Sequence, residues 1–175
     1  MCAGLKIDLF FCDRIAYGFK LYRRDKRRLA RMPNLAGSRG FLLSRSLKWR
    51  FKLKDKICIA HKSEAAVIAR SKIRLGVDAE RILRRDFDAI MEFCFDERER
   101  KFVQNAHDKI LAFYKIWTAK EAYIKFKKLG FSSLKSVNFY EILHKMTVNF
   151  IRIDDFLVAL IYKKTVRGEV YLWRA

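Results

Sequence analysis

Residues 108–130 read DKILAFYKIWTAKEAYIKFKKLG, and the prediction of the fold starts from this stretch. Its apolar residues recur every three or four positions, which at about 100° per residue places them on one side of a helix. We expect the helix to span Asp108–Lys128 and to stop at Gly130. The apolar stripe consists of Ile110, Phe113, Trp117 and Ile124.

Glu121 lies within that apolar stripe, beside Trp117. A carboxylate that faces inward needs a partner, because burying it unpaired costs free energy. Lys125 is one candidate, since a Glu followed by a Lys four residues later stabilises a helix by about 0.2–0.5 kcal/mol. Alternatively, Glu121 is a metal ligand or a general base, and Lys120 and Lys125 hold anionic oxygens nearby. The residues alone leave both interpretations open.

The patterns on either side of this helix predict a mixed α+β fold. Helices and strands are mixed within each half of the chain, and the end of the chain is rich in hairpins. A boundary near residues 81–86 divides the chain into halves 1–82 and 83–175. The other expected helices are Leu21–Arg31, Gly40–Trp49, Phe87–Phe93 and Asp96–Asn105, the last with Asp96 as its N-cap and Glu99 at N3. The expected strands are Lys6–Phe11, Lys56–His61, Ala65–Ser71, Ile73–Glu80, Val137–Ile142, Met146–Ile153, Phe156–Lys163 and Glu169–Trp173.

A second group of candidate residues is Gly76-Val77-Asp78-Ala79-Glu80. Alternate side chains of a strand share a face, so Asp78 and Glu80 project to the same side. Two carboxylates held so close repel each other unless a cation lies between them, and a divalent ion with oxygen ligands is the simplest solution. Gly76 permits a close backbone approach. The plainer interpretation is a pair of surface carboxylates facing Arg81.

Composition and charge narrow the classes of function. The chain has 39 Lys and Arg against 19 Asp and Glu, for a net charge of +20. Such a charge attracts nucleic acid, an anionic membrane surface, phosphate-rich small molecules or an acidic protein. No uncharged stretch reaches the length of a membrane helix, and charged Lys6 and Asp8 argue against a signal peptide. Four dispersed cysteines without a C-x-x-C pair fit a reducing cytoplasm and no structural zinc.

In their order along the chain, these motifs resemble those of the 4′-phosphopantetheinyl transferases, in the monomeric Sfp-like type that activates surfactin synthetase. That family carries G-[IV]-D-x-E and, further on, W-[ST]-x-K-E-[AS]-x-x-K, which are matched here by Gly76–Glu80 and Trp117–Lys125. Phe95–Glu99 is similar to the F-S-x-x-E motif between them. The family's S-H-S strand is reduced to Ala60-His61-Lys62, so a Ser that contacts phosphate is absent.

The resemblance implies two similar α/β halves in a pseudo-twofold fold, with coenzyme A as co-substrate between them. It implies an enzyme, a holo-[acyl-carrier-protein] synthase, that moves the 4′-phosphopantetheine arm from coenzyme A to a Ser of an apo acyl carrier protein. The other product is adenosine 3′,5′-bisphosphate. Fatty acid biosynthesis is the expected context, and a cytoplasmic monomer with no nucleic-acid or membrane partner is expected.

Residue roles follow from the same resemblance. Mg²⁺ would be held by Asp78, Glu80 and Glu121, and Glu121 could also accept the Ser proton. Lys125 and His61 would contact the reacting phosphates, and Lys120 would help to hold them. Lys26 and Arg39 in the basic N-terminal half would reach the 3′-phosphate or adenine end of coenzyme A. An acidic carrier protein would dock on the basic helix Gly40–Trp49, through residues such as Arg45 and Lys48, and on Lys and Arg residues near the site.

Two other functions remain open at this stage. The many basic residues interleaved with aromatics also suit a nucleic-acid-binding module, although that function gives no reason for the three carboxylates. A Mg²⁺-dependent nuclease would use the same three carboxylates.

Overall fold

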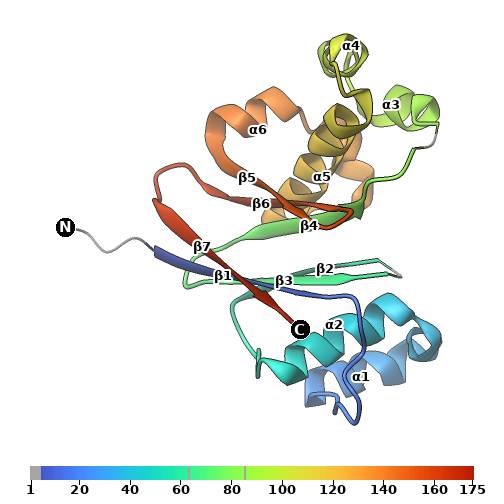
Figure 1. Cartoon of the computed structure of the whole chain (residues 1–175), viewed down its shortest axis with the longest axis vertical. Coiled ribbons are helices and arrows are strands. Elements are labelled where there is room, and N and C mark those ends of the chain that lie inside the picture. The colour runs from blue at the N-terminus through green and yellow to red at the C-terminus, as the bar shows by residue number, and fades with distance from the viewer. Residues whose placement is uncertain (1–4, 63, 85) are drawn as a thin grey trace. The chain divides into compact units, whose positions relative to one another are not determined.

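The computed structural model describes residues 5–62, 64–84 and 86–175, and it confirms the α+β class (Figure 1). Its contacts divide the chain into two compact units. Unit 1 comprises residues 1–73 and 167–175, and unit 2 comprises residues 74–166. These units differ from the expected halves 1–82 and 83–175. The strand at residues 76–81 pairs with a strand of unit 2, and the last strand returns to unit 1.

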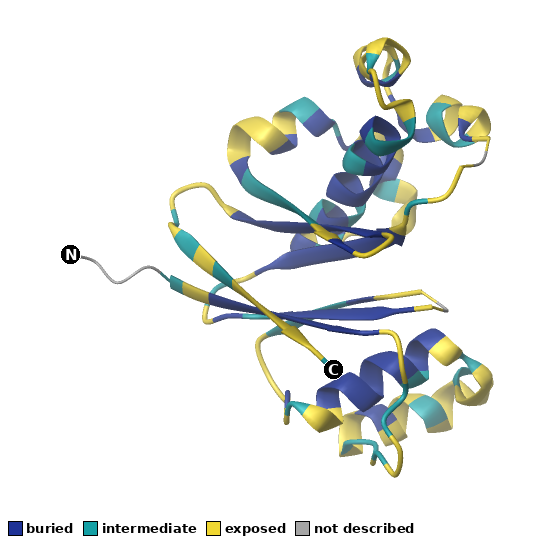
Figure 2. Cartoon of the chain, in the orientation of Figure 1, coloured by how far each residue is buried: buried dark blue, intermediate teal, exposed yellow. Residues whose placement is uncertain are grey.

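Unit 2 is an antiparallel sheet of three strands with one long helix against it. Strand β4 (Gly76–Arg81) pairs with β6 (Phe156–Lys163), and β6 pairs with β5 (Met146–Ile153). Helix α5 (Lys109–Lys127) packs against β4 and β6, whose residues are almost all buried (Figure 2). The remaining elements of this unit are α3 (Asp88–Cys94), α4 (Glu97–Asn105), the 3₁₀ helix η2 (Phe131–Ser136) and α6 (Phe139–Lys145).

The start of α4 has the capping arrangement that its sequence indicates. The Asp96 carboxylate accepts a hydrogen bond from the Glu99 backbone nitrogen at 2.8 Å, and the Glu99 carboxylate accepts one from the Asp96 nitrogen at 2.9 Å. Two backbone donors that a helix start leaves without partners are thereby satisfied. The fixed position of Glu99 becomes important for α5, described below.

The strand expected at Val137–Ile142 is wrong, because this stretch begins helix α6. The Asn138 side chain accepts a hydrogen bond from the Glu141 backbone nitrogen, as an N-cap residue does. Phe139 and Ile142, three residues apart, are then buried on one face of the short helix. Helix α5 also ends earlier than expected.

The end of α5 is set by Lys128 rather than by Gly130. The backbone of Lys128 takes a left-handed conformation with φ of 60°, and its N–H bonds to the carbonyl groups of Ile124 and Lys125. A left-handed residue at this point satisfies the last free carbonyl groups of a helix. A non-glycine residue therefore ends this helix.

Unit 1 has a sheet of four strands in the order β2-β3-β1-β7. Strand β3 (Ala66–Arg70) lies between β2 (Ile57–His61) and β1 (Leu5–Cys12), antiparallel to both. The last strand, β7 (Gly168–Arg174), is parallel to β1. The helices of this unit are α1 (Arg23–Arg31), η1 (Pro33–Gly37) and α2 (Arg39–Arg50), of which α2 packs on the sheet.

The two units share one topology. Each runs from a strand through helices to an antiparallel hairpin, and the second strand of the hairpin pairs with the first strand of the unit. The strand orders β2-β3-β1 and β5-β6-β4 are therefore equivalent, with α2 and α5 as corresponding helices. Strand β7 is an addition to unit 1. This correspondence supplies the two similar α/β halves that the motifs implied.

Helix α2 does not present the docking surface expected for Gly40–Trp49. Arg45 and Lys48 are buried, and both pair with Asp25 of α1, at 2.8 Å and 2.5 Å. Burial lowers the pKa of the Arg45 guanidinium, and Asp25 opposes that effect. The expectation fails for these two residues because Asp25, the single acidic residue of α1, faces inward and pairs with both of them.

Candidate active site

Two carboxylates of the site, Asp78 and Glu80, lie two residues apart on strand β4. Asp78 lies opposite Ala159 and Glu80 opposite Leu157 in the antiparallel register with β6. Their side chains therefore share one face of the sheet, and both are almost fully buried. Buried carboxylates on a strand require compensation from an element packed on that face, which here is α5.

Gly76 allows α5 to approach β4 closely. A Cβ atom at this position would lie 2.1 Å from the carbonyl oxygen of Ala122 and 2.9 Å from Cβ of Phe126. Any side chain at residue 76 would therefore force the strand and the helix apart. The glycine thus lets the α5 backbone at Ala122, the residue after Glu121, contact the strand that carries Asp78.

Asp78, Glu80 and Glu121 form a cluster. One oxygen of each carboxylate lies within 4.8 Å of the others, so the three could hold one ion. The second oxygen of Asp78, Oδ2, is buried without a hydrogen-bond partner among the described residues. A set of carboxylate oxygens is the donor set that Mg²⁺ and similar hard cations prefer. The residues therefore fit a divalent cation, and the predicted convergence of the three is seen in the structure.

Lys125 partly neutralises this cluster. Its Nζ lies 2.6 Å from Oδ1 of Asp78 and 4.0 Å from Oε2 of Glu121. The helical pair with Glu121 is therefore the longer of the two contacts, and Asp78 is the nearer partner. The Lys125 side chain is 30% exposed, so its ammonium group can also reach an anion from solvent. This position suits the role predicted for it beside a phosphate.

Trp117 is a member of the site that the sequence placed only in the apolar stripe. Its indole Nε1 donates a hydrogen bond to Oε1 of Glu80 at 3.1 Å. This bond orients a metal-ligand candidate from the helix that also supplies Glu121. The spacing of four residues between Trp117 and Glu121 was the available signal, because such residues lie one above the other on a helix.

Lys120 lies in a different place from the one expected of a phosphate-binding residue. It is fully buried, with Nζ 2.7 Å from Oε2 of Glu99 and also bonded to the carbonyl oxygen of Cys94. Glu99 also accepts hydrogen bonds from the backbone nitrogens of Asp96 and Phe139. Lys120 therefore connects α5 to α4, and through Glu99 it also connects α5 to the starts of α4 and α6. Its ammonium group is bound inside the protein.

The remaining predicted site residues belong to unit 1. His61 is exposed at the end of β2, and its ring packs close to Gly40, where an added Cβ would lie 2.8 Å from Nδ1. Arg39 is exposed and donates to the carbonyl oxygen of Asp13 at 3.2 Å. Lys26 is exposed on α1. The roles assigned to these three residues stay predictions.

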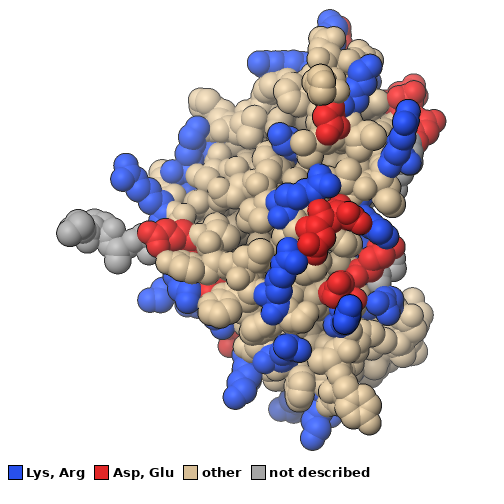
Figure 3. Space-filling view, in the orientation of Figure 1, with Lys and Arg blue, Asp and Glu red and all other residues tan. Residues whose placement is uncertain are grey.

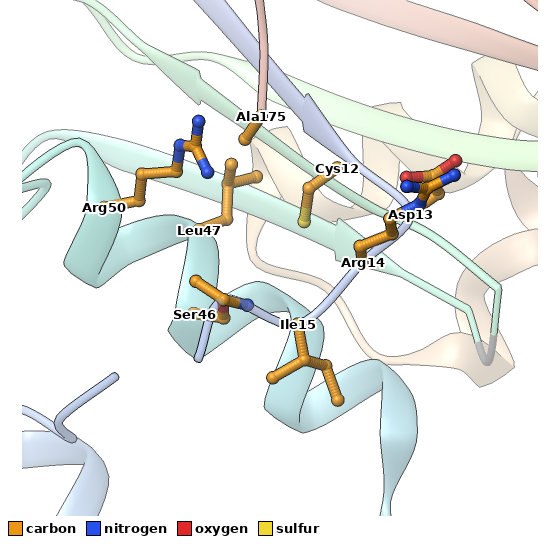
Figure 4. A pocket seen from close by; sticks show the side chains of 9 residues that line it. Cys12, Asp13, Arg14, Ile15, Ser46, Leu47, Arg50 and Ala175 are labelled. Carbon is orange, nitrogen blue, oxygen red and sulfur yellow. The ribbon is translucent and has the colours of Figure 1, made fainter. Parts of the chain in front are cut away.

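A cavity of about 370 Å³ lies in unit 1 (Figure 4). Arg14 and Arg50 line it together with Cys12, whose thiol donates to the carbonyl oxygen of Leu43. Burial raises the pKa of this thiol to about 12, so almost no thiolate exists at neutral pH. The cavity contains none of the three clustered carboxylates and offers no reactive nucleophile.

The surface of the protein carries many basic side chains (Figure 3). Lys and Arg side chains are spread over the face drawn in Figure 3, in keeping with the net charge of +20. Within the described residues, every helix is too short or too polar to cross a lipid bilayer.

Comparison with known proteins places this site in a family. No curated protein matches the chain. The family model of the 4′-phosphopantetheinyl transferase superfamily matches residues 74–166, which are more than half of the chain and contain all three carboxylates, Trp117 and Lys125. Because this match spans the whole of unit 2, the chain belongs to the 4′-phosphopantetheinyl transferase superfamily.

Proposed function

We propose that the protein transfers the 4′-phosphopantetheine arm of coenzyme A to the Ser hydroxyl of an apo acyl carrier protein, in a Mg²⁺-dependent reaction. Its products are the holo carrier protein and adenosine 3′,5′-bisphosphate. Membership of the superfamily supports phosphopantetheinyl transfer in general. The finer proposal is carried by one observation, the cluster of Asp78, Glu80 and Glu121, in which a buried Asp78 oxygen has no hydrogen-bond partner among the described residues.

The chemistry explains why this site needs acidic ligands and a cation. The Ser oxygen forms a bond to the phosphorus that carries the pantetheine arm, and the bond from that phosphorus to the bridging pyrophosphate oxygen breaks. The attacked phosphorus is surrounded by negative oxygens and the leaving group is itself a phosphate, so positioning and charge neutralisation dominate the barrier. A divalent cation, when bound, neutralises pyrophosphate and leaving-group oxygens. Asp78, Glu80 and Glu121 would hold that cation.

Lys125 and Glu121 would act on the reacting groups directly. The Lys125 side chain is 30% exposed and its ammonium group contacts Asp78, where it would bind an oxygen of the transferred phosphate. Glu121 is 13% exposed, against 3% for the Asp78 side chain. We therefore assign the Ser proton to Glu121, directly or through a water molecule.

Unit 1 would supply further contacts to coenzyme A. We assign the 3′-phosphate to the exposed cations Lys26 and Arg39, and a second phosphate to His61, at the position of the family's S-H-S strand. The presence of two equivalent β-α-β-β units within one chain supports the Sfp-like type and a monomeric enzyme. The dispersed cysteines support a cytoplasmic location.

Intact-mass analysis tests this function. Apo acyl carrier protein incubated with the protein, coenzyme A and Mg²⁺ should gain the mass of one phosphopantetheine. Asp78→Asn or Glu121→Gln should slow the transfer at least about 100-fold, because charge stabilisation by a bound metal is worth several kcal/mol. Glu141→Gln is the matched control, since Glu141 is exposed and pairs with Lys145 on α6.

The outcomes separate the competing functions. Near-normal turnover of Asp78→Asn would remove the metal site from the reaction. An unchanged carrier mass together with Mg²⁺-dependent cleavage of nucleic acid would identify a nuclease. Salt-sensitive binding of DNA or RNA without affinity for coenzyme A would identify a nucleic-acid-binding module.

A further inference from the structure

From the last residue of α5 onward, the chain forms a basic and apolar segment, KKLGFSSLKS at residues 127–136. We call it the 127–136 segment. Its lysines, Lys127, Lys128 and Lys135, are all exposed, and it contains no acidic residue. Leu129 and Phe131 are 46% and 59% exposed. Exposed apolar side chains surrounded by charges of one sign are typical of a binding surface.

The 127–136 segment is held in a defined conformation. The Leu129 backbone nitrogen donates to the carbonyl oxygen of Ile124 at 2.8 Å, and η2 covers residues 131–136. Leu134 is fully buried and belongs to the core of unit 2. The exposure of Leu129 and Phe131 is therefore built into the fold, and a partner would lose little entropy in ordering this surface.

This segment adjoins the carboxylate cluster. The ring of Phe131 packs edge-on against the indole of Trp117, with ring centroids 6.2 Å apart. The same indole donates to Glu80. One aromatic contact and one hydrogen bond therefore connect the exposed Phe131 to a metal-ligand candidate. A molecule bound on Phe131 would lie beside the site where transfer takes place.

The charge of the segment indicates the chemistry of its partner. Among the residues that the structure describes, Lys127, Lys128 and Lys135 form no ion pair with a carboxylate. Their positive charge is therefore available to an acidic partner. Platforms for single-stranded nucleic acid combine several stacking aromatics with arginines. The segment has one aromatic residue, an aliphatic Leu129 and no Arg, which favours an acidic protein surface with an exposed apolar side chain.

We propose that the 127–136 segment is the docking surface for the acidic apo carrier protein. Leu129 and Phe131 would pack against an apolar side chain near the acceptor Ser, and the lysines would face carboxylates around it. The inference rests on the proposed function and identifies where its protein substrate binds. It assigns to unit 2 the docking role that the buried cations of α2 do not fill.

Steady-state kinetics with purified apo acyl carrier protein tests the surface. Leu129→Ser, and separately Lys127→Glu combined with Lys135→Glu, should raise KM for the carrier protein about tenfold, as the loss of about 1.4 kcal/mol of binding would. The values of kcat and of KM for coenzyme A should change less than about twofold, because uniform binding is lost without a change at the reacting atoms. Lys54→Glu combined with Lys72→Glu in unit 1 is the control, since both lysines are exposed and the charge change is the same.

Three results would overturn the docking surface. The first is an unchanged KM for the carrier protein in both segment variants while the wild type is active. The second is an equal rise in KM in the unit 1 control, which would show a general charge effect. The third is a larger loss of single-stranded DNA binding than of carrier binding.

Failure of the wild type to transfer the arm would count against the proposed function instead. In that case, equal dissociation constants of apo carrier protein for the wild type and Leu129→Ser, from fluorescence anisotropy, would still overturn the surface.

Discussion

Removing the ammonium group of Lys120 should cost this protein a large part of its stability. The side chains of Lys120 and Glu99 are 1% and 0% exposed, with Nζ and Oε2 2.7 Å apart. Lys120→Met keeps an unbranched side chain and deletes the charge. Glu99 then stays in the interior, where its donors among the described residues are the backbone nitrogens of Asp96 and Phe139.

The magnitude follows from the loss of charge compensation. Breaking a buried ion pair by removing one partner costs about 3–5 kcal/mol, because an uncompensated charge is left in a medium of low polarity. Two backbone donors still bind Glu99, so we expect the free energy of unfolding to fall by about 3 kcal/mol. Adding Glu99→Gln should recover at least about 1 kcal/mol, since the uncompensated charge disappears while an acceptor oxygen remains.

Chemical denaturation by urea, followed by circular dichroism at pH 7, measures these changes. Lys101→Met is the matched control, because it breaks the exposed ion pair between Lys101 and Glu97 on α4. That control should leave the unfolding midpoint unchanged. The reasoning is refuted if the free energy of unfolding of Lys120→Met lies within about 1 kcal/mol of that of the wild type. It is also refuted if the double variant is less stable than Lys120→Met alone.

Three further perturbations test other parts of the structure. Gly76→Ala places a Cβ 2.1 Å from a backbone carbonyl oxygen of α5, so it should lower the free energy of unfolding, measured in urea, by about 1–3 kcal/mol. It should also weaken the binding of Mn²⁺, measured by electron paramagnetic resonance. Burial raises the pKa of Asp8, but hydrogen bonds led by that of Arg70 together outweigh it, so the pKa lies below 3.8. The stability that Asp8 contributes is therefore present above pH 3.8 and lost as the pH falls through the folded-state pKa. The difference in the free energy of unfolding between the wild type and Asp8→Asn should shrink in acid. A growing difference would contradict this explanation. With the pKa of the buried Cys12 raised to about 12, a thiol reagent at pH 7 should label the more accessible Cys58 well before Cys12, and equal rates would argue against the packing of β1.

Residues 108–130 show how much secondary structure a local residue pattern can predict. Its 3.6-residue repeat predicted helix α5 almost to its ends, and Asp96 with Glu99 predicted the cap of α4. Both predictions depend only on neighbours within one or two helical turns. The strand expected at Val137–Ile142 failed because a β-branched and aromatic stretch suits either structure, and a short helix starting at Asn138 buries Phe139 and Ile142 in the core.

By itself, the sequence determined the α+β class, most of the helices and strands, and the carboxylates that could hold a cation. Alternation along β4 and helical spacing along α5 specify which side chains share a face, and these are local properties of the backbone. Only the tertiary structure decided which cation faces which carboxylate. Lys125 contacts Asp78 and Lys120 is buried with Glu99, although both lysines flank Glu121 in the sequence. Such pairings depend on how closely distant elements pack, as Gly76 permits for β4 and α5, and a one-dimensional pattern carries no distance between elements.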